Sequence, residues 1–153
     1  MAKQRVLFIC THNSARSQMA EAMLRSFAPD GFDAFCAGTE ATSVRPEAIQ
    51  VMDEIGIDIS AQQSKSLERY LHEPFDWLIT VCDNARQNCP VFPGVEQAAH
   101  WSVDDPTEET GGDEARLEAF RHARDDLRNR IRLFIAAASR PDLPHHPAET
   151  IGA

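Results

Sequence analysis

No stretch of this 153-residue sequence is apolar over the ~18–20 residues that a membrane-spanning helix requires. Residues 1–5 lead directly into a strand-like run and lack the apolar core and cleavage site of a secretory signal. The apolar fraction of 42% and the charged fraction of 25% are typical of soluble globular domains. We therefore expect a cytoplasmic protein without a membrane partner.

The sequence also lacks an excess of basic residues. It has 15 Lys and Arg residues against 24 Asp and Glu residues, which gives a formal net charge of −9. Proteins that bind nucleic acid or anionic lipid favour a basic face, so we expect neither partner. An anionic substrate would have to be held by nearby groups that outweigh the screened charge of distant side chains.

Cysteine is scarce, and no two cysteines form a C-x2-C pair. The four are Cys10, Cys36, Cys82 and Cys89. In a chain of this size without a secretory signal, such thiols are expected to be reactive or metal-binding rather than structural disulfides.

Short apolar runs alternate with amphipathic segments along the chain. The runs predict strands at residues 5–9, 32–36, 77–81 and 98–101, and the helical spacing predicts helices at 17–27, 46–55 and 114–138. This alternation predicts an α/β fold with a parallel sheet and right-handed crossovers. We assign residues 1–138 to one domain and expect the Pro- and His-containing residues 139–153 to be a disordered tail.

The loop between the first strand and the first helix has the composition of an anion site. Its backbone N–H groups and the positive end of the helix dipole suit a tetrahedral oxyanion, and Arg16 can add a bidentate donor. The same field would stabilise a thiolate at Cys10, which Ser17 can also reach with a hydrogen bond. Asn13 can hold a left-handed turn. The alternative is a buried strand-end cysteine followed by a surface arginine.

The segment Cys10-Thr11-His12-Asn13-Ser14-Ala15-Arg16-Ser17 resembles the anion loop of the low-molecular-weight protein tyrosine phosphatases and of the arsenate reductases that share their fold. The resemblance continues through residues 37–39, 57–60 and 100–101 to 104–106, and covers about residues 4–135. It implies a single-domain, Rossmann-like, four-stranded parallel sheet with helices on both faces. It also implies that Cys10 is the nucleophile, residues 11–17 bind the oxyanion, and Asp105 is the general acid. Ala15 and His12 depart from the pattern, since several relatives carry cysteine and many carry glycine there.

The position of Asp105 is reasonable without the resemblance. It lies in an Asp-Pro step just beyond the predicted fourth strand, where open parallel sheets place groups that touch ligands. A carboxylic acid beside a bound oxyanion can protonate the departing oxygen. The adjacent Asp104 is the alternative candidate.

Cys82 and Cys89 distinguish a reductase from a phosphatase, which needs only the loop and the acid. Cys82 follows a strand expected beside the first one, and the pair resembles the resolving cysteines of thioredoxin-coupled arsenate reductases. If residues 82–89 were one helix, the two Cα atoms would be about 10 Å apart, but a disulfide needs them within about 7 Å. The segment must therefore be looped already, or unwind when the bond forms. The alternatives are two inert thiols, or half of a zinc site with His100 or His72.

We therefore predict an enzyme that reduces arsenate to arsenite. Cys10 attacks, Cys82 and then Cys89 resolve the adduct, and thioredoxin reduces the resulting disulfide, with no metal or other cofactor. We expect a monomer, in which Cys36 is buried and Lys65 is either solvated or a fixed cation near Glu21. A low-molecular-weight protein tyrosine phosphatase is one alternative, although Thr107-Glu108-Glu109 has no aromatic residue to grip a phenol ring and its two acidic residues would repel a phosphopeptide. A non-catalytic thiol module that captures arsenite or zinc is the other.

Overall fold

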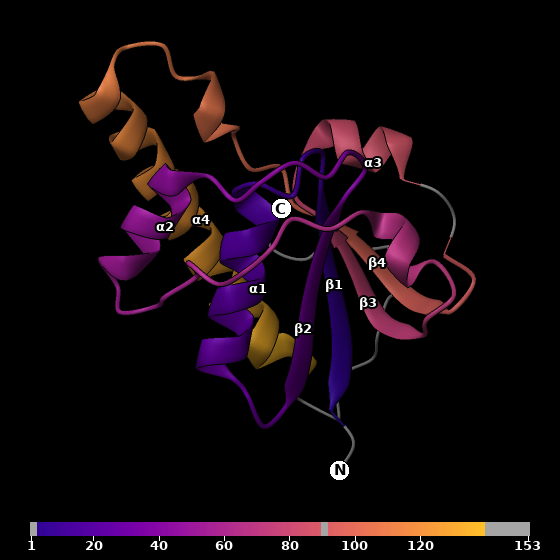
Figure 1. Ribbon diagram of the computed structural model, residues 1–153. Coiled ribbons are helices and arrows are strands. Elements are labelled where there is room, and N and C mark those ends of the chain that lie inside the picture. The colour runs from indigo at the N-terminus through magenta and orange to yellow at the C-terminus, as the bar shows by residue number, and fades with distance from the viewer. Residues whose placement is uncertain (1–2, 90–91, 140–153) are drawn as a thin grey trace.

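The computed structural model describes residues 3–89 and 92–139, and it is built around one four-stranded sheet (Figure 1). The strands are β1 (Gln4–Cys10), β2 (Phe32–Gly38), β3 (Phe75–Thr80) and β4 (Val95–His100). All pairs are parallel, in the order β2-β1-β3-β4. The predicted four-stranded parallel sheet is confirmed. The third and fourth strands begin two and three residues before the predicted starts, because Phe75 already pairs with Val95. Each of the two strands ends one residue before the predicted end.

In the described part of the chain, four α-helices and two short 3₁₀ helices connect or cover the strands. The α-helices are α1 (Arg16–Phe27), α2 (Pro46–Asp53), α3 (Asp83–Asn88) and α4 (Asp113–Ala138), and the 3₁₀ helices are η1 (Leu67–Tyr70) and η2 (Pro106–Glu108). The three predicted helices are thus present. α2 ends two residues before the predicted end, and Gly56 follows it with a positive φ of 78° that favours glycine. The predicted tail lies outside the described residues except for Ser139, which caps α4.

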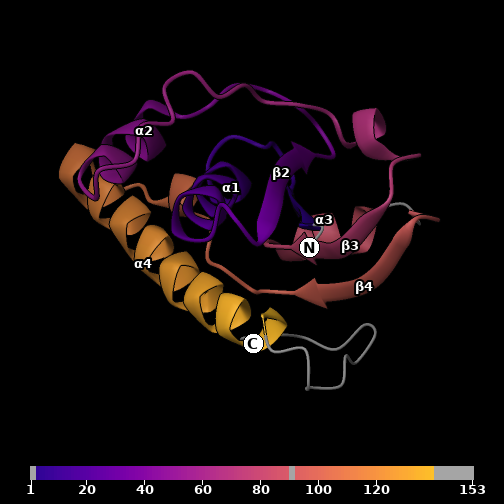
Figure 2. The same ribbon diagram turned by 90° about the horizontal axis from the view of Figure 1, so that it is seen from below.

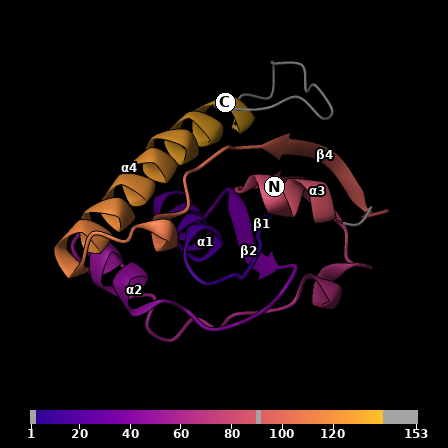
Figure 3. The same ribbon diagram turned by 90° about the horizontal axis from the view of Figure 1, so that it is seen from above.

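Views along the sheet show how the helices cover it (Figures 2 and 3). α1 and α4 lie on one face, and η1 lies on the opposite face with the segment that follows α2. An aromatic cluster supports each layer. Phe134 of α4 packs against Phe32 and Trp77, whereas Tyr70 of η1 packs against Phe35 and Phe75. These rings, all buried except the partly buried Phe35, hold the sheet between its two coverings.

Because the strands are parallel, their carboxyl ends lie at one edge of the sheet. There, β1 leads through residues 11–15 into α1, β3 leads through Cys82 into α3, and β4 leads into the loop before η2 (Figure 1). The hydrogen bond from Val81 N to Ile9 O continues the β1–β3 pairing past the last paired residues. The residues that follow β1 and β3 therefore stay adjacent. Among the described helices, none is long and apolar enough to cross a membrane.

Candidate active site

The loop of residues 10–15, which begins at the last residue of β1, is held by its carbonyl groups. Four of them accept hydrogen bonds from the backbone N–H groups of residues 39–45, at donor–acceptor distances of 2.8–3.3 Å. Asn13 O accepts from the Gln18 side chain, and Ala15 O accepts from Met19 N in α1. All six carbonyls of the loop are therefore satisfied by the surrounding protein, which fixes the backbone orientation.

The N–H groups of the same loop have no such partners. Within residues 3–89 and 92–139, none from Thr11 to Arg16 donates a hydrogen bond to another protein group. These donors lie at the N-terminus of the 12-residue helix α1, where the helix dipole adds partial positive charge. Such an arrangement is suited to an anion with several oxygen atoms.

Asn13 holds the turn that makes this arrangement possible. It has a positive φ of 50°, as the sequence predicted for a left-handed turn. Its Nδ2 donates to Ser17 Oγ at 2.8 Å, and its Oδ1 accepts from the backbone N of Lys65 at 2.7 Å. Ser17 Oγ in turn lies 2.8 Å from the sulfur of Cys10, which is 3% exposed. The predicted contact between Ser17 and the Cys10 sulfur is thus present.

Arg16 and Asp105 meet across the loop, as expected for groups that act on one ligand. Arg16 Nη1 donates to Val103 O at 2.8 Å, and Nη2 lies 3.4 Å from Asp105 Oδ2. The other oxygen of Asp105 accepts hydrogen bonds from the backbone N and the hydroxyl of Thr107, which orients the carboxyl group. Asp104 is exposed, and within the described residues it has no such contacts. The geometry therefore favours Asp105 over its neighbour as the acid.

Cys82 and Cys89 lie at the two ends of α3, and neither forms a disulfide. Cys82 is the N-cap residue, and its sulfur accepts a hydrogen bond from Ala85 N at 3.4 Å. The hydroxyl of Thr11 lies 3.3 Å from the same sulfur. Burial raises the pKa of the Cys89 thiol to about 11. Of the two predicted alternatives for residues 82–89, the structure adopts the helix, so a bond between these thiols requires α3 to unwind.

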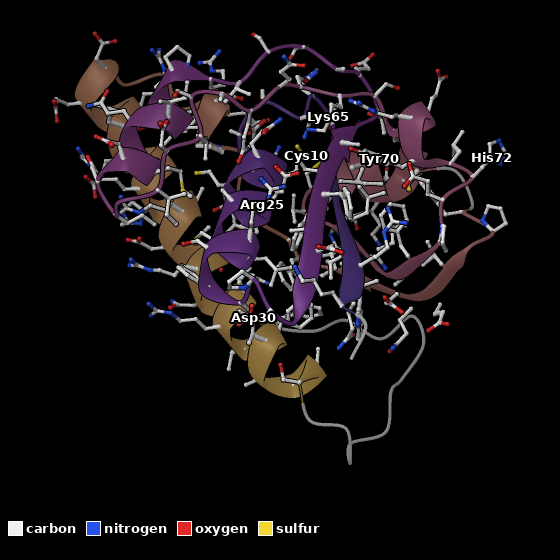
Figure 4. All side chains as sticks on the ribbon, turned by 60° about the horizontal axis from the view of Figure 1, so that its bottom comes forward. Cys10, Arg25, Asp30, Lys65, Tyr70 and His72 are labelled. Atoms are coloured by element: carbon white, nitrogen blue, oxygen red, sulfur yellow. The ribbon has the colours of Figure 1, made fainter. Side chains whose placement is uncertain are left out.

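The fourth thiol, that of Cys36, lies behind the anion loop. Cys36 is fully buried, as predicted, and burial raises its pKa to about 12, with the nearby Glu21 carboxyl adding to the effect. Lys65 Nζ lies 3.6 Å from the Cys36 sulfur, and its charge lowers the pKa of Glu21 against the larger upward effect of burial. Figure 4 shows Lys65 and Cys10 at the same end of the sheet, far from Asp30. Lys65 is therefore a partly buried cation near Glu21.

His100 lies next to the site, and its contacts with Thr80 and Asp83 were not expected from the sequence. It bridges Thr80 and Asp83, the residues that flank Val81 and Cys82, with distances of 2.7 Å on each side. His72, the other histidine considered for a zinc site, is exposed and lies beyond η1 (Figure 4). No group of three or more His, Cys, Asp or Glu side chains within the described ranges could hold a metal ion.

Comparison with known proteins places this geometry in a family. A model of the family described as low molecular weight phosphotyrosine protein phosphatase matches residues 5–142. The chain belongs to this family. An arsenate reductase from Halalkalibacterium halodurans is 41% identical over 134 residues, which cover 88% of this chain and 96% of that protein. The fold and the resemblance predicted for this member of the phosphatase family are confirmed.

Solved structures of arsenate reductases have the same fold as this chain. A structure described as an arsenate reductase in the phosphate binding state superposes with a TM-score of 0.75 at 33% identity. Another, described as an arsenate reductase in the oxidized state, gives a TM-score of 0.72 at 31% identity. Each alignment covers 87% of this chain and 97% of the other.

Proposed function

We propose that this protein is an arsenate reductase that uses Cys10, Cys82 and Cys89 in sequence and is regenerated by thioredoxin. The observation that carries the proposal is the contact between Thr11, which belongs to the anion loop, and the sulfur of Cys82. A phosphatase needs the loop and an acid, but it does not need a second thiol in contact with the loop. The arsenate reductases at 35–41% identity over most of the chain support the same assignment.

In the first step, the free N–H groups of residues 11–16 and the Arg16 guanidinium bind arsenate. The Cys10 thiolate attacks the arsenic atom and forms an S–As bond, while one oxygen leaves as water after Asp105 donates a proton. Ser17, 2.8 Å from the Cys10 sulfur, can stabilise the thiolate before attack. These donors act at short range, so they can bind an anion although the formal net charge of the chain is −9.

In the second step, the Cys82 thiolate attacks the Cys10 sulfur. The S–S bond forms as the S–As bond breaks, and its electron pair stays on arsenic, which leaves as arsenite. Cys89 then attacks Cys82, Cys10 leaves as a thiolate, and the Cys82–Cys89 disulfide remains. The two thiols supply both electrons, and the dithiol of thioredoxin restores them by exchange. We infer that the enzyme works as a monomer in the cytoplasm, because this is the compartment in which a dithiol donor such as thioredoxin is kept reduced.

Anaerobic single turnover tests the proposal. The fully reduced protein is mixed with excess arsenate, quenched with an alkylating reagent, and its disulfides are mapped by mass spectrometry beside a phosphate control. We expect one equivalent of arsenite and a Cys82–Cys89 disulfide with arsenate, and neither with phosphate. Four reduced cysteines after exposure to arsenate would overturn the relay and favour a phosphatase. Stoichiometric binding of added arsenite, with no turnover of arsenate, would favour a thiol-binding module.

A further inference from the structure

A hydrogen-bonded chain of side chains ties the first turn of α3 to the sheet. His100, the last residue of β4, has Nδ1 2.7 Å from Thr80 Oγ1 and Nε2 2.7 Å from Asp83 Oδ1. Ser102 donates to the same Asp83 oxygen at 2.8 Å. The side chain of His100 is only 11% exposed, whereas the Asp83 side chain that it contacts is 72% exposed. Together they hold Asp83, and Asp83 is bonded directly to Cys82.

The first turn of α3 makes hydrogen bonds outside the helix. In the first turn, Asp83 contacts β4 and the following loop, and Asn84 accepts from the Thr11 hydroxyl at 3.0 Å. Further along, the exposed side chains of Arg86, Gln87 and Asn88 make no hydrogen bond outside α3 to any residue that the structure describes. The Asn88 side chain donates to Asn84 O within the helix. A helix of six residues has little stability of its own, so these attachments are what keeps its first turn in place.

We propose that His100 and Asp83 are positioning residues for Cys82. They hold the first turn of α3 against β4, so that the Cys82 sulfur stays beside Thr11 while the rest of the helix unwinds. In the second step of the relay, this places Cys82 for attack on the Cys10 sulfur. In the last step, Cys89 loses its proton to solvent and bonds to Cys82, and Cys10 departs as a thiolate. The inference rests on the proposed function for its role in turnover.

Three substitutions and one matched control test the role. Asp83→Ala and His100→Ala remove the attachment, and His100→Gln retains a side-chain amide that can donate to Asp83. Gln87→Ala changes an exposed α3 residue without touching the attachment. The readouts are phosphate affinity, the rate of arsenite release in a single turnover, and the rate at which an alkylating reagent labels Cys82 in the reduced protein.

We expect unchanged phosphate affinity in all four variants, because the anion loop is intact. Arsenite release should slow at least about tenfold in Asp83→Ala and His100→Ala, since a small displacement of a reacting group has effects of this size. Cys82 should be labelled faster in the same two variants, and His100→Gln should recover much of the wild-type behaviour. Wild-type rates of both release and labelling in Asp83→Ala would overturn the inference. A wild-type protein that releases no arsenite would instead refute the proposed function, and the labelling rates would still report whether Cys82 is held.

Discussion

The hydroxyl of Thr11 lies 3.3 Å from the sulfur of Cys82, so the anion loop and the second thiol of the proposed relay are in direct contact. Thr11 also follows Cys10 in the chain, and its carbonyl is fixed by Glu40 N. The same loop that orients the nucleophile therefore also contacts Cys82. A resolving thiol at this place lies beside the loop that begins at Cys10, whereas Cys89 lies at the other end of α3.

Replacing Cys89 with serine should stop the relay after arsenite has been released. Cys10 and Cys82 remain able to complete the first two steps, but the disulfide between them cannot be resolved. We expect a single burst of one equivalent of arsenite per protein and a trapped Cys10–Cys82 disulfide, measured by quench and peptide mapping. Sustained turnover of Cys89→Ser with thioredoxin would show that the third thiol is unnecessary.

Asp105→Asn should slow the first chemical step without weakening anion binding. The amide cannot supply the proton, and loss of a general acid costs ~10²–10⁴-fold in rate. Arsenate turnover should fall by a factor in this range, while phosphate affinity stays constant or rises, because a carboxylate 3.4 Å from Arg16 is removed. Asp104→Asn is the matched control, since this neighbouring carboxylate is exposed. Equal losses in the two variants would contradict the assignment of the acid.

The sequence predicted the sheet, the long helices and the anion loop because each has a local signature. Alternating apolar segments indicate strands and helices, and Asn13 and Ser17 lie within the loop that they brace. Contacts between distant segments had no such signature. Lys65 N reaches Asn13 only because the chain after α2 wraps over the loop, and His100 reaches Asp83 only because β3 and β4 are neighbours. The helical state of residues 83–88 was likewise undecided, because local propensity alone did not determine it.

Gly38→Ala should damage the anion loop, whereas Gly31→Ala should not. A Cβ atom at position 38 would lie 2.7 Å from Thr11 O and 2.8 Å from Asn13 N, both backbone atoms that cannot move freely. A Cβ at position 31 meets nothing within 4 Å. We expect Gly38→Ala to lose roughly 1–3 kcal/mol of stability and most of its phosphate affinity. Denaturant unfolding and phosphate titration of both variants measure this, and equal behaviour would contradict the close packing of β2 on the loop.

Glu54 should contribute stability that disappears in acid. Its carboxylate accepts hydrogen bonds from Arg121 and Arg124 of α4, which hold its pKa at about 2, below the ordinary value of 4.5. Because the folded-state pKa is lowered, the contribution is complete above about pH 4.5 and is lost as the pH falls toward 2. Glu54→Gln should cost at most about 1 kcal/mol at pH 7, since the pair is partly exposed. The difference from wild type in denaturant unfolding should vanish near pH 2, unlike that of the exposed control Glu96→Gln, which should be near zero throughout.

The pH dependence of Cys89 reports whether α3 shields this thiol. Burial raises its pKa from 9.0 to about 11, so the folded protein favours the neutral thiol, and this stabilising effect is complete below pH 9 and lost as the pH rises through 11. At neutral pH the thiolate should be about 100-fold scarcer than in an unfolded chain, since each pKa unit is a factor of ten. Alkylation of Cys89 in the reduced protein should therefore rise steeply with pH up to a midpoint near 11, and the urea-unfolded protein should give a midpoint near 9. A folded-state midpoint near 9 would mean that the helix already exposes the thiol, and that unwinding is not needed to activate it.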